Sequence, residues 1–339
     1  MILFKGAMIA IIGLVVLFFG IGLMLPSTVH VERAITVEAP QATLFALTNS
    51  FARFNEWSPW AARDPEARYS FTGPPRGVGA GMSWQSDHPN VGSGSQEIIS
   101  STPFEEVRTA LDFGEQGTAE AFFHFVPKGE TVTVTWGFDT DFGVNLVGRW
   151  FGLFFDSMLG PDYEAGLSRL KTLAEGLPGD DWSDIELSVV EMEPVLIAST
   201  RGRCPHVMEE IGPALARAYS KVGAFMKRHR LEKAAMPLVV NHEWRNEYVF
   251  EAGIPITAEP EVGPAGGAEV GISRTPGGFM VKAVHVGPYG RMGTTYSKLK
   301  AYAAAYGLEL SEPAWEQYVS DPGDTPEEEL ITHIYYPLK

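Results

Sequence analysis

A short sequence occurs twice in the C-terminal half of the chain, as Tyr219-Ser220-Lys221-Val222 and as Tyr296-Ser297-Lys298-Leu299. Each copy lies in a segment whose apolar residues recur at helical spacing, residues 205–230 and residues 289–306. One strand-like run precedes each helix and two follow it, so the order strand, helix, strand, strand occurs twice. The predicted strands are Val195–Arg203, Leu238–Glu243 and Glu247–Ile256 in the first copy, and Phe279–Val286, Ala314–Ser320 and Glu329–Pro337 in the second.

This repeat predicts the architecture of residues 184–339. One strand-helix-strand-strand unit has an apolar sheet face that its single helix cannot cover, so two units are expected to share one sheet. We expect a pseudo-twofold sheet with both helices on the same side. The domain follows a linker, residues 177–183, at a Gly/Pro/Asp-rich stretch.

Residues 29–176 predict another α+β domain. Residues 29–37 alternate like a strand, a short helix begins near Pro40, and residues 144–175 have helical spacing with a break at Gly160-Pro161. The long helix should pack against a curved antiparallel sheet. Its remaining strands are predicted at Ala67–Thr72, Gly81–Gln85, Ser93–Ser101, Glu106–Phe113, Ala119–Val126 and Thr131–Thr140.

Residues 1–28 predict a membrane anchor. No charge occurs from Gly6 to Leu25, and a helix of that length spans roughly 30 Å, the thickness of a bilayer core. A cleaved signal peptide is the alternative, but its apolar region is usually shorter. Lys5 precedes the span, so we expect a single-pass protein of the inner membrane, with a cytoplasmic N-terminus and the folded domains outside.

Composition excludes several classes of function. The chain has 339 residues, 45% of them hydrophobic and 20% charged, which is typical of a globular protein. A net charge of -16 argues against a nucleic-acid partner. Cys204 is the only cysteine, and His88 and His124 have no neighbours at metal-ligand spacing, so neither a metal site nor a cofactor is predicted.

The N-terminal domain resembles the polyketide cyclase/START-like helix-grip superfamily, also called SRPBCC. The resemblance lies in Phe54–Trp60 and in Asp162–Lys171. It implies a ligand cavity between sheet and helix, but no general set of catalytic residues. Trp57, Trp84 and Trp136 are our candidates for lining that cavity, and packing in the core is the alternative.

The C-terminal domain resembles the GyrI-like small-molecule-binding domain, the effector-binding domain of AraC-type and MerR-type activators. The resemblance lies in residues 285–289, 315–318, 320–322 and 328–338. It implies a cleft for organic, often cationic or aromatic, compounds, with Glu316 as the glutamate among aromatic residues and Trp315 and Tyr318 beside it. Those regulators carry a DNA-binding domain where this chain has a helix-grip domain, so a direct transcriptional role is not expected.

Residue chemistry supports part of this implied site. On a strand, Glu316 and Tyr318 share a face, whereas Trp315 points the other way unless the strand bulges. A carboxylate among aromatic rings can bind a cation, and a solvated edge-strand glutamate is the alternative. Three further candidates are Tyr289 and Tyr296, which line the cleft or pack on the sheet, and Trp244 near the corresponding strand end of the first copy.

The predicted function is membrane-anchored binding of a hydrophobic, aromatic or cationic small molecule, for sensing, sequestration or transfer. The alternative is an enzyme, a hydrolase or cyclase with Glu316 as general base. The sequence contains no nucleophile-His-acid motif and no phosphate-binding loop. Binding is therefore the favoured interpretation.

Overall fold

The computed structural model describes residues 2–260 and 269–339. The chain forms two compact units, Met1–Gly179 and Asp180–Lys339. Both units are α+β, and each contains one antiparallel sheet. The predicted fold class is confirmed for the two domains.

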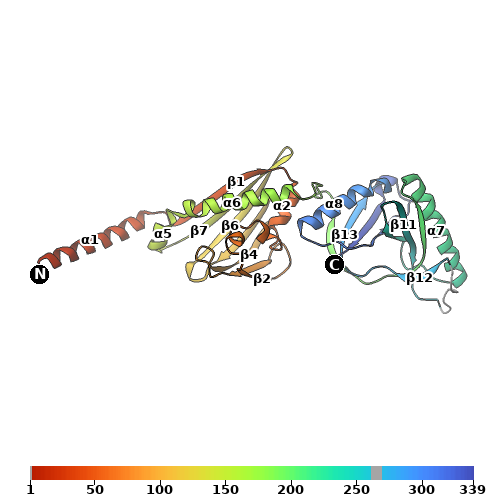
Figure 1. Ribbon diagram of the computed structural model, residues 1–339, viewed down its shortest axis with the longest axis horizontal. Helices are drawn as coiled ribbons and strands as arrows, with labels where there is room; N and C mark the ends of the chain where they lie inside the picture. The colour runs from red at the N-terminus through yellow and green to blue at the C-terminus, as the bar shows by residue number, and fades with distance from the viewer. Residues whose placement is uncertain (1, 261–268) are drawn as a thin grey trace. The chain divides into compact units, whose positions relative to one another are not determined.

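The first unit is a seven-stranded sheet with the order β1-β7-β6-β5-β4-β3-β2. Its long helix α6 lies along the sheet beside β1 (Figure 1). The elements are α1 (Ile2–Met24), β1 (Thr28–Val37), α2 (Gln41–Thr48), α3 (Phe54–Trp57), α4 (Pro59–Arg63), β2 (Arg68–Thr72), β3 (Gly81–Gln85), β4 (Ser93–Thr102), β5 (Glu106–Asp112), η1 (Gly114–Gln116), β6 (Thr118–Lys128), β7 (Thr131–Asp141), α5 (Leu146–Gly152) and α6 (Phe155–Glu175).

The core of this unit lies between α6 and the inner sheet face. Tyr163, Leu167, Leu170 and Ala174 of α6 are buried at helical spacing, because they form the stripe that faces the sheet. The predicted helix break at Gly160-Pro161 is wrong, since α6 runs through Pro161 and the interruption lies at residues 153–154. Pro161 lies in the second turn, where only a single backbone bond is lost.

Aromatic rings cover glycines at three cross-strand pairs. Phe122 lies opposite Gly137, Trp84 opposite Gly94, and, in the second unit, Phe250 opposite Gly202. A methyl group on Gly137 would lie 2.0 Å from the Phe122 ring, and on Gly202 2.5 Å from the Phe250 ring. Glycine is therefore required at these positions by packing, because the ring occupies the space that a side chain would need.

The second unit is an eight-stranded sheet with the order β12-β9-β11-β10-β14-β15-β13-β8. The order is symmetric about the β10–β14 pair. On its two sides, β11 corresponds to β15, β9 to β13 and β12 to β8, as expected for two copies of one unit. The elements are β8 (Leu187–Met192), β9 (Leu196–Pro205), α7 (Met208–His229), β10 (Leu238–Glu243), β11 (Glu247–Pro255), β12 (Gly271–Arg274), β13 (Gly278–Val286), η2 (Tyr289–Arg291), α8 (Met292–Ala305), β14 (Ala314–Tyr318), η3 (Glu327–Glu329) and β15 (Ile331–Pro337). The edge strands β8 and β12 were not predicted.

Both helices cover one face of this sheet. Ala218 of α7 packs in a cluster with Val239 of β10, while Tyr296 of α8 reaches Glu316 of β14. Val239 and Glu316 are direct cross-strand partners, so their side chains point to the same face. Figure 1 shows α7 beside β11 on this face.

Helix α1 carries the apolar N-terminal sequence. Within residues 2–260 and 269–339, no helix is both long and apolar enough to span a membrane. The predicted span of residues 6–25 includes residues 6, 7, 9 and 10, whose side chains lie outside the described part of the chain. The structure therefore does not support the predicted anchor.

Candidate functional site

A cavity of about 1130 Å³ lies in the second unit between the two helices and the sheet. Its floor is formed by β10, β11 and β14, which contribute Asn241, Tyr248 and Glu316. Helices α7 and α8 form the walls and contribute Tyr219 and Tyr296. The duplicated fold creates this space, because two helices that each cover half a sheet leave a gap above its central strands.

Glu316 is the buried charge on the cavity floor. Its strand β14 lies between β10 and β15, inside the sheet, and only 3% of the residue is exposed. The alternative of a solvated edge-strand glutamate is therefore wrong. Burial raises the pKa of Glu316, and the hydrogen bonds from Tyr296, Asn241 and Tyr318 oppose that rise because they stabilise the ionised carboxylate.

Hydrogen bonds to Glu316 come from three side chains. The Tyr296 hydroxyl donates to Oε1 at 2.7 Å, and the Asn241 amide donates to the same oxygen at 3.0 Å. Oε2 accepts a long bond of 3.4 Å from the Tyr318 hydroxyl. Oε2 is therefore the oxygen with more remaining capacity to accept a hydrogen bond.

Tyr248 sets the direction of this network. Its hydroxyl donates to Oδ1 of Asn241 at 2.8 Å, so the amide nitrogen of Asn241 must face Tyr296 and Glu316. That nitrogen donates to the Tyr296 oxygen at 3.0 Å, which leaves the Tyr296 proton for the carboxylate. Burial and the nearby Glu316 charge raise the pKa values of Tyr248 and Tyr296, so both phenols remain neutral donors.

Aromatic side chains surround the carboxylate. The rings of Tyr289 and Tyr318 meet edge to face, with centroids 5.4 Å apart. Tyr219 donates to the backbone oxygen of Leu238 at 2.9 Å, which holds its ring against the floor. Trp244 lines the cavity, is 46% exposed, and contacts the Tyr248 ring at 4.4 Å.

The structure brings five of the six predicted residues of this domain to the cavity. Glu316, Tyr318, Tyr289, Tyr296 and Trp244 all line it. Trp315 does not, because the strand has no bulge at this position and successive side chains point to opposite faces. Trp315 instead stacks on Tyr335 at 4.1 Å in the apolar cluster of the other sheet face.

Sequence reasoning missed Asn241, Tyr248 and Tyr219 as site residues. Asn241 lies opposite Ala314 and Tyr248 lies on the next strand, so their closeness to Glu316 depends on strand register. Tyr219 carried a usable signal, because it matches Tyr296 in the repeated tetrapeptide. Two equivalent helix positions of a duplicated fold are expected to face the same space.

The first unit has a smaller cavity of about 330 Å³ inside the helix-grip core. Trp57, Trp84 and Trp136 line it, and Trp136 also packs in the core, stacked on Tyr163 at 3.9 Å. Trp57 is fully buried, and its indole Nε1 has no hydrogen-bond partner among the described residues. A buried donor without a partner is costly.

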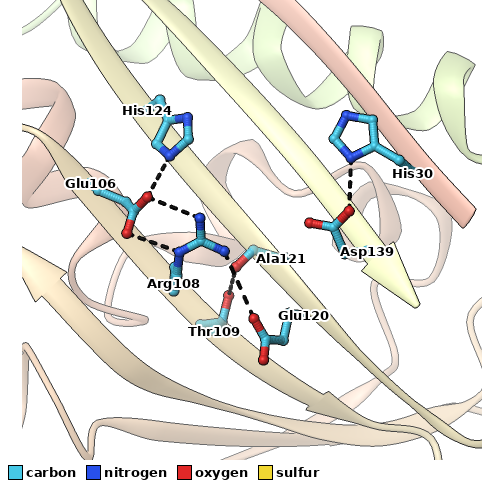
Figure 2. Close-up of polar contacts among 8 residues, drawn as sticks. All are labelled: His30, Glu106, Arg108, Thr109, Glu120, Ala121, His124 and Asp139. Atoms are coloured by element: carbon cyan, nitrogen blue, oxygen red, sulfur yellow. Dashed lines mark hydrogen bonds and ion pairs between the residues drawn. The ribbon is translucent and has the colours of Figure 1, made fainter. Parts of the chain in front are cut away.

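A row of polar residues crosses the outer face of the first sheet (Figure 2). Arg108 joins Glu106 and Glu120, and Glu106 also contacts His124. Asp139 contacts His30 on the neighbouring strand at 2.7 Å and raises its pKa. Among the described residues, no group of His, Cys, Asp and Glu could hold a metal ion. These contacts link neighbouring strands.

Comparisons with solved structures give weak similarities. The EcmrR C-terminal domain is 17% identical, with 46% of this chain and 98% of that chain covered and a TM-score of 0.38. A hydrolase from Listeria innocua is 14% identical, with 45% and 92% covered and a TM-score of 0.35. A point mutant of norcoclaurine synthase from Thalictrum flavumn is 13% identical, with 43% and 94% covered and a TM-score of 0.34. These scores carry no argument about function.

Family models give the stronger result, although no curated protein matches the chain. Residues 28–175 match the model described as polyketide cyclase / dehydrase and lipid transport. Residues 185–339 match the model described as GyrI-like small molecule binding domain. Both resemblances inferred from the sequence are confirmed, in the predicted order. The chain therefore joins a domain of the polyketide cyclase / dehydrase and lipid transport family, residues 28–175, to a GyrI-like small-molecule-binding domain, residues 185–339.

Proposed function

We propose that this protein binds organic cations that carry an aromatic or hydrophobic group, in the cavity of its second unit. One observation carries the proposal, which is that the buried carboxylate of Glu316 faces a space walled by tyrosines. Cation-π contact with these rings and Coulomb attraction to Glu316 would act on the same ligand. The volume of about 1130 Å³ is ample for a compound of drug size.

Charge, more than hydrogen bonding, is the property that Glu316 offers a ligand. Tyr296 and Asn241 already donate to Oε1, while their neutral groups leave the negative charge uncompensated. A ligand cation would supply that compensation in a partly desolvated site, where ionic contacts are stronger than in water. A neutral ligand would leave the buried negative charge of Glu316 without a counterion.

The test compares two planar dyes with the same ring system, cationic proflavine and neutral acridone. Glu316→Gln keeps the shape of the side chain and removes its charge, so proflavine affinity should fall roughly ten- to a hundredfold, about 1.5 to 3 kcal/mol. Acridone affinity should change little. The matched control is Glu309→Gln, because Glu309 is an exposed partner of Lys339 outside the cavity.

Calorimetric titration measures both affinities for the three proteins. Equal proflavine affinity in wild type and Glu316→Gln would contradict the proposal. An equal loss of proflavine affinity in Glu309→Gln would show that the effect comes from the net charge of the protein and not from the cavity.

The second candidate function is hydrolysis or cyclisation of a small molecule with Glu316 as general base. Burial raises the pKa of Glu316 toward the range useful for proton transfer. Among the described residues, Oε2 accepts only the long bond from Tyr318, so it could bind a water molecule or a substrate proton. Mass spectrometry of a library of activated esters and lactones, incubated with wild type and Glu316→Gln, tests for turnover that depends on this carboxyl.

We further propose that helix α1 attaches the chain to the inner membrane, with the folded domains outside the cytoplasm. The support comes from the sequence, in which residues 6–25 carry no charge and Lys5 precedes them. Flotation with membranes that resists alkaline carbonate would support attachment. A C-terminal reporter that is active only in the cytoplasm would contradict the orientation.

A further inference from the structure

A set of exposed apolar side chains lies where α5 meets α6 in the first unit. We call it the junction patch, and it consists of Val144, Val147, Phe151, Leu153, Phe154 and Met158, each more than half exposed. Later residues of α6, from Tyr163 onward, bury their apolar stripe against the sheet. The junction patch therefore lacks the cover that the rest of α6 has within the described part of this unit.

The junction patch adjoins helix α1 through two side chains of α5. Arg149 donates hydrogen bonds to the backbone oxygens of Leu23 at 3.3 Å and Leu25 at 3.1 Å, at the C-terminal end of α1. Trp150 stacks on Phe18 with centroids 5.2 Å apart, and its indole donates to the Phe18 oxygen at 3.2 Å. These contacts hold α5 beside the C-terminal half of α1, so the exposed apolar side chains of the two helices belong to neighbouring elements.

The exposure of α1 favours lipid over protein as the material that covers this surface. Every residue from Ile11 to Gly20 is exposed, so the apolar side chains lie all around the helix. A helix that docks on one protein partner needs only a single apolar stripe. A tryptophan and an arginine at the junction are also the residue types found at the level of lipid headgroups.

Two carboxylates of α6 near the patch are held in ion pairs. Arg33 contacts Asp156, which lies between the patch residues Phe154 and Met158, at 2.9 Å, and it contacts Glu164, further along α6, at 2.8 Å. The polar groups here are mutually paired, and the chain carries a net charge of -16. Attraction to anionic lipid would therefore contribute little, and burial of apolar side chains would drive the contact.

We propose that the junction patch inserts into the surface of a lipid bilayer beside α1. This inference rests on the proposed attachment of α1 to a membrane. It adds a second point of contact, which would hold the helix-grip domain against the bilayer instead of leaving it to rotate freely about residues 25–28. Binding should be as strong to zwitterionic as to anionic vesicles.

A single-cysteine probe tests the insertion in the full chain. Cys204→Ala removes the one native thiol, and Phe154→Cys or Val126→Cys then takes an environment-sensitive fluorophore. Phe154 and Val126 are both 58% exposed, which makes Val126 a matched control. Val126 pairs with Thr133, and Thr133 pairs with Thr36. Val126 therefore lies near the end of β1 that is opposite Thr28, the end at which α1 joins.

Each labelled protein is reconstituted into phosphatidylcholine vesicles that contain nitroxide lipids. The fluorophore at residue 154 should be quenched several-fold more than that at residue 126. Equal quenching in protein that floats with the vesicles would overturn the patch proposal and leave attachment by α1 intact. Protein that does not float would overturn both proposals. If the protein self-associates in detergent and Phe154→Asp abolishes that association, the patch contacts a second copy of the chain. That result would also overturn the lipid proposal.

Discussion

The Tyr296 hydroxyl donates a 2.7 Å hydrogen bond to Oε1 of Glu316 while it accepts one from Asn241 at 3.0 Å. Tyr296 comes from α8 in the second copy of the repeat, and Asn241 comes from β10 in the first copy. The carboxylate is therefore held by both halves of the duplicated domain. A change in either half should alter the pKa of Glu316.

We predict that Tyr296→Phe shifts the pH dependence of cation binding upward. A cation needs the ionised form of Glu316, so its affinity should fall as pH falls through the pKa of this carboxyl. Loss of the Tyr296 hydroxyl removes a bond that stabilises the ionised form, so the already raised pKa rises further. Proflavine titrations in steps from pH 5 to pH 8 measure the midpoint. Tyr289→Phe is the control, and an unshifted midpoint in Tyr296→Phe would show that the bond does not act on Glu316.

Glu316→Gln should make the ligand-free protein more stable at neutral pH. The pKa of Glu316 in the folded protein lies above the ordinary value of 4.5. The folded state of the wild type is therefore most stable below pH 4.5, where Glu316 is protonated, and it loses stability as pH rises through the folded pKa and the buried carboxyl ionises. Glutamine does not ionise, so the variant should melt at a higher temperature at pH 7.5, by about 2 to 4 °C for each kcal/mol gained. The difference should vanish near pH 4.5. A variant that melts lower than wild type at both pH values would contradict this reasoning.

Two tryptophans named by the same sequence argument should behave differently. Trp315 is 1% exposed and stacked on Tyr335, so Trp315→Ala should cost about 3 to 5 kcal/mol of unfolding free energy. Trp244 is 46% exposed in the cavity wall, so Trp244→Ala should cost much less but weaken proflavine binding. Urea denaturation and dye titration measure both quantities. The opposite pattern would place Trp315 at the ligand.

Trp57 gives a prediction for the first unit, since its buried Nε1 lacks a partner among the described residues. A ligand in the helix-grip cavity should be favoured if it carries an acceptor, because it would satisfy this donor. We expect 2-acetonaphthone to bind roughly tenfold more tightly than 2-ethylnaphthalene, about 1.4 kcal/mol. Trp57→Phe should remove the preference and Trp84→Phe should keep it. Equal binding of both compounds to wild type, measured by fluorescence titration, would mean that Trp57 only packs the core.

Much of the fold could be predicted from sequence because its signals are local. Alternation along β7 and helical spacing in α7 depend on neighbouring residues, and the repeated tetrapeptide relates the two halves directly. The edge strands β8 and β12 escaped prediction. They are short, pair on one side only, and show little alternation of burial.

The site could be predicted only in part because it depends on register. Glu316 was identifiable by resemblance, and the alternation rule already warned that Trp315 would face away. The hydrogen bond from Asn241 to Glu316 was not identifiable from the sequence. It forms only because β10 pairs with β14 in the register that places Asn241 opposite Ala314. A shift of one residue would turn Asn241 to the other face of the sheet.

Packing dictates the residue at the glycine positions that aromatic rings cover. A methyl group at position 137 would lie 2.0 Å from the Phe122 ring, so Gly137→Ala must displace the ring and should cost about 1 to 3 kcal/mol. Phe122→Ala should also be costly, because the ring is 5% exposed and lies under His30, His124 and Arg108. In the double variant the added methyl occupies space that the ring has left.

The double variant should therefore cost less than the sum of the single changes, by about 1 to 3 kcal/mol. Urea denaturation of the four proteins completes the cycle. Gly223→Ala is the control for alanine itself, because that helical position is open to solvent and should gain up to about 1 kcal/mol. Single changes that add within about 0.5 kcal/mol would show that the ring moves aside freely. The glycine would then be explained by strand geometry and not by the ring that covers it.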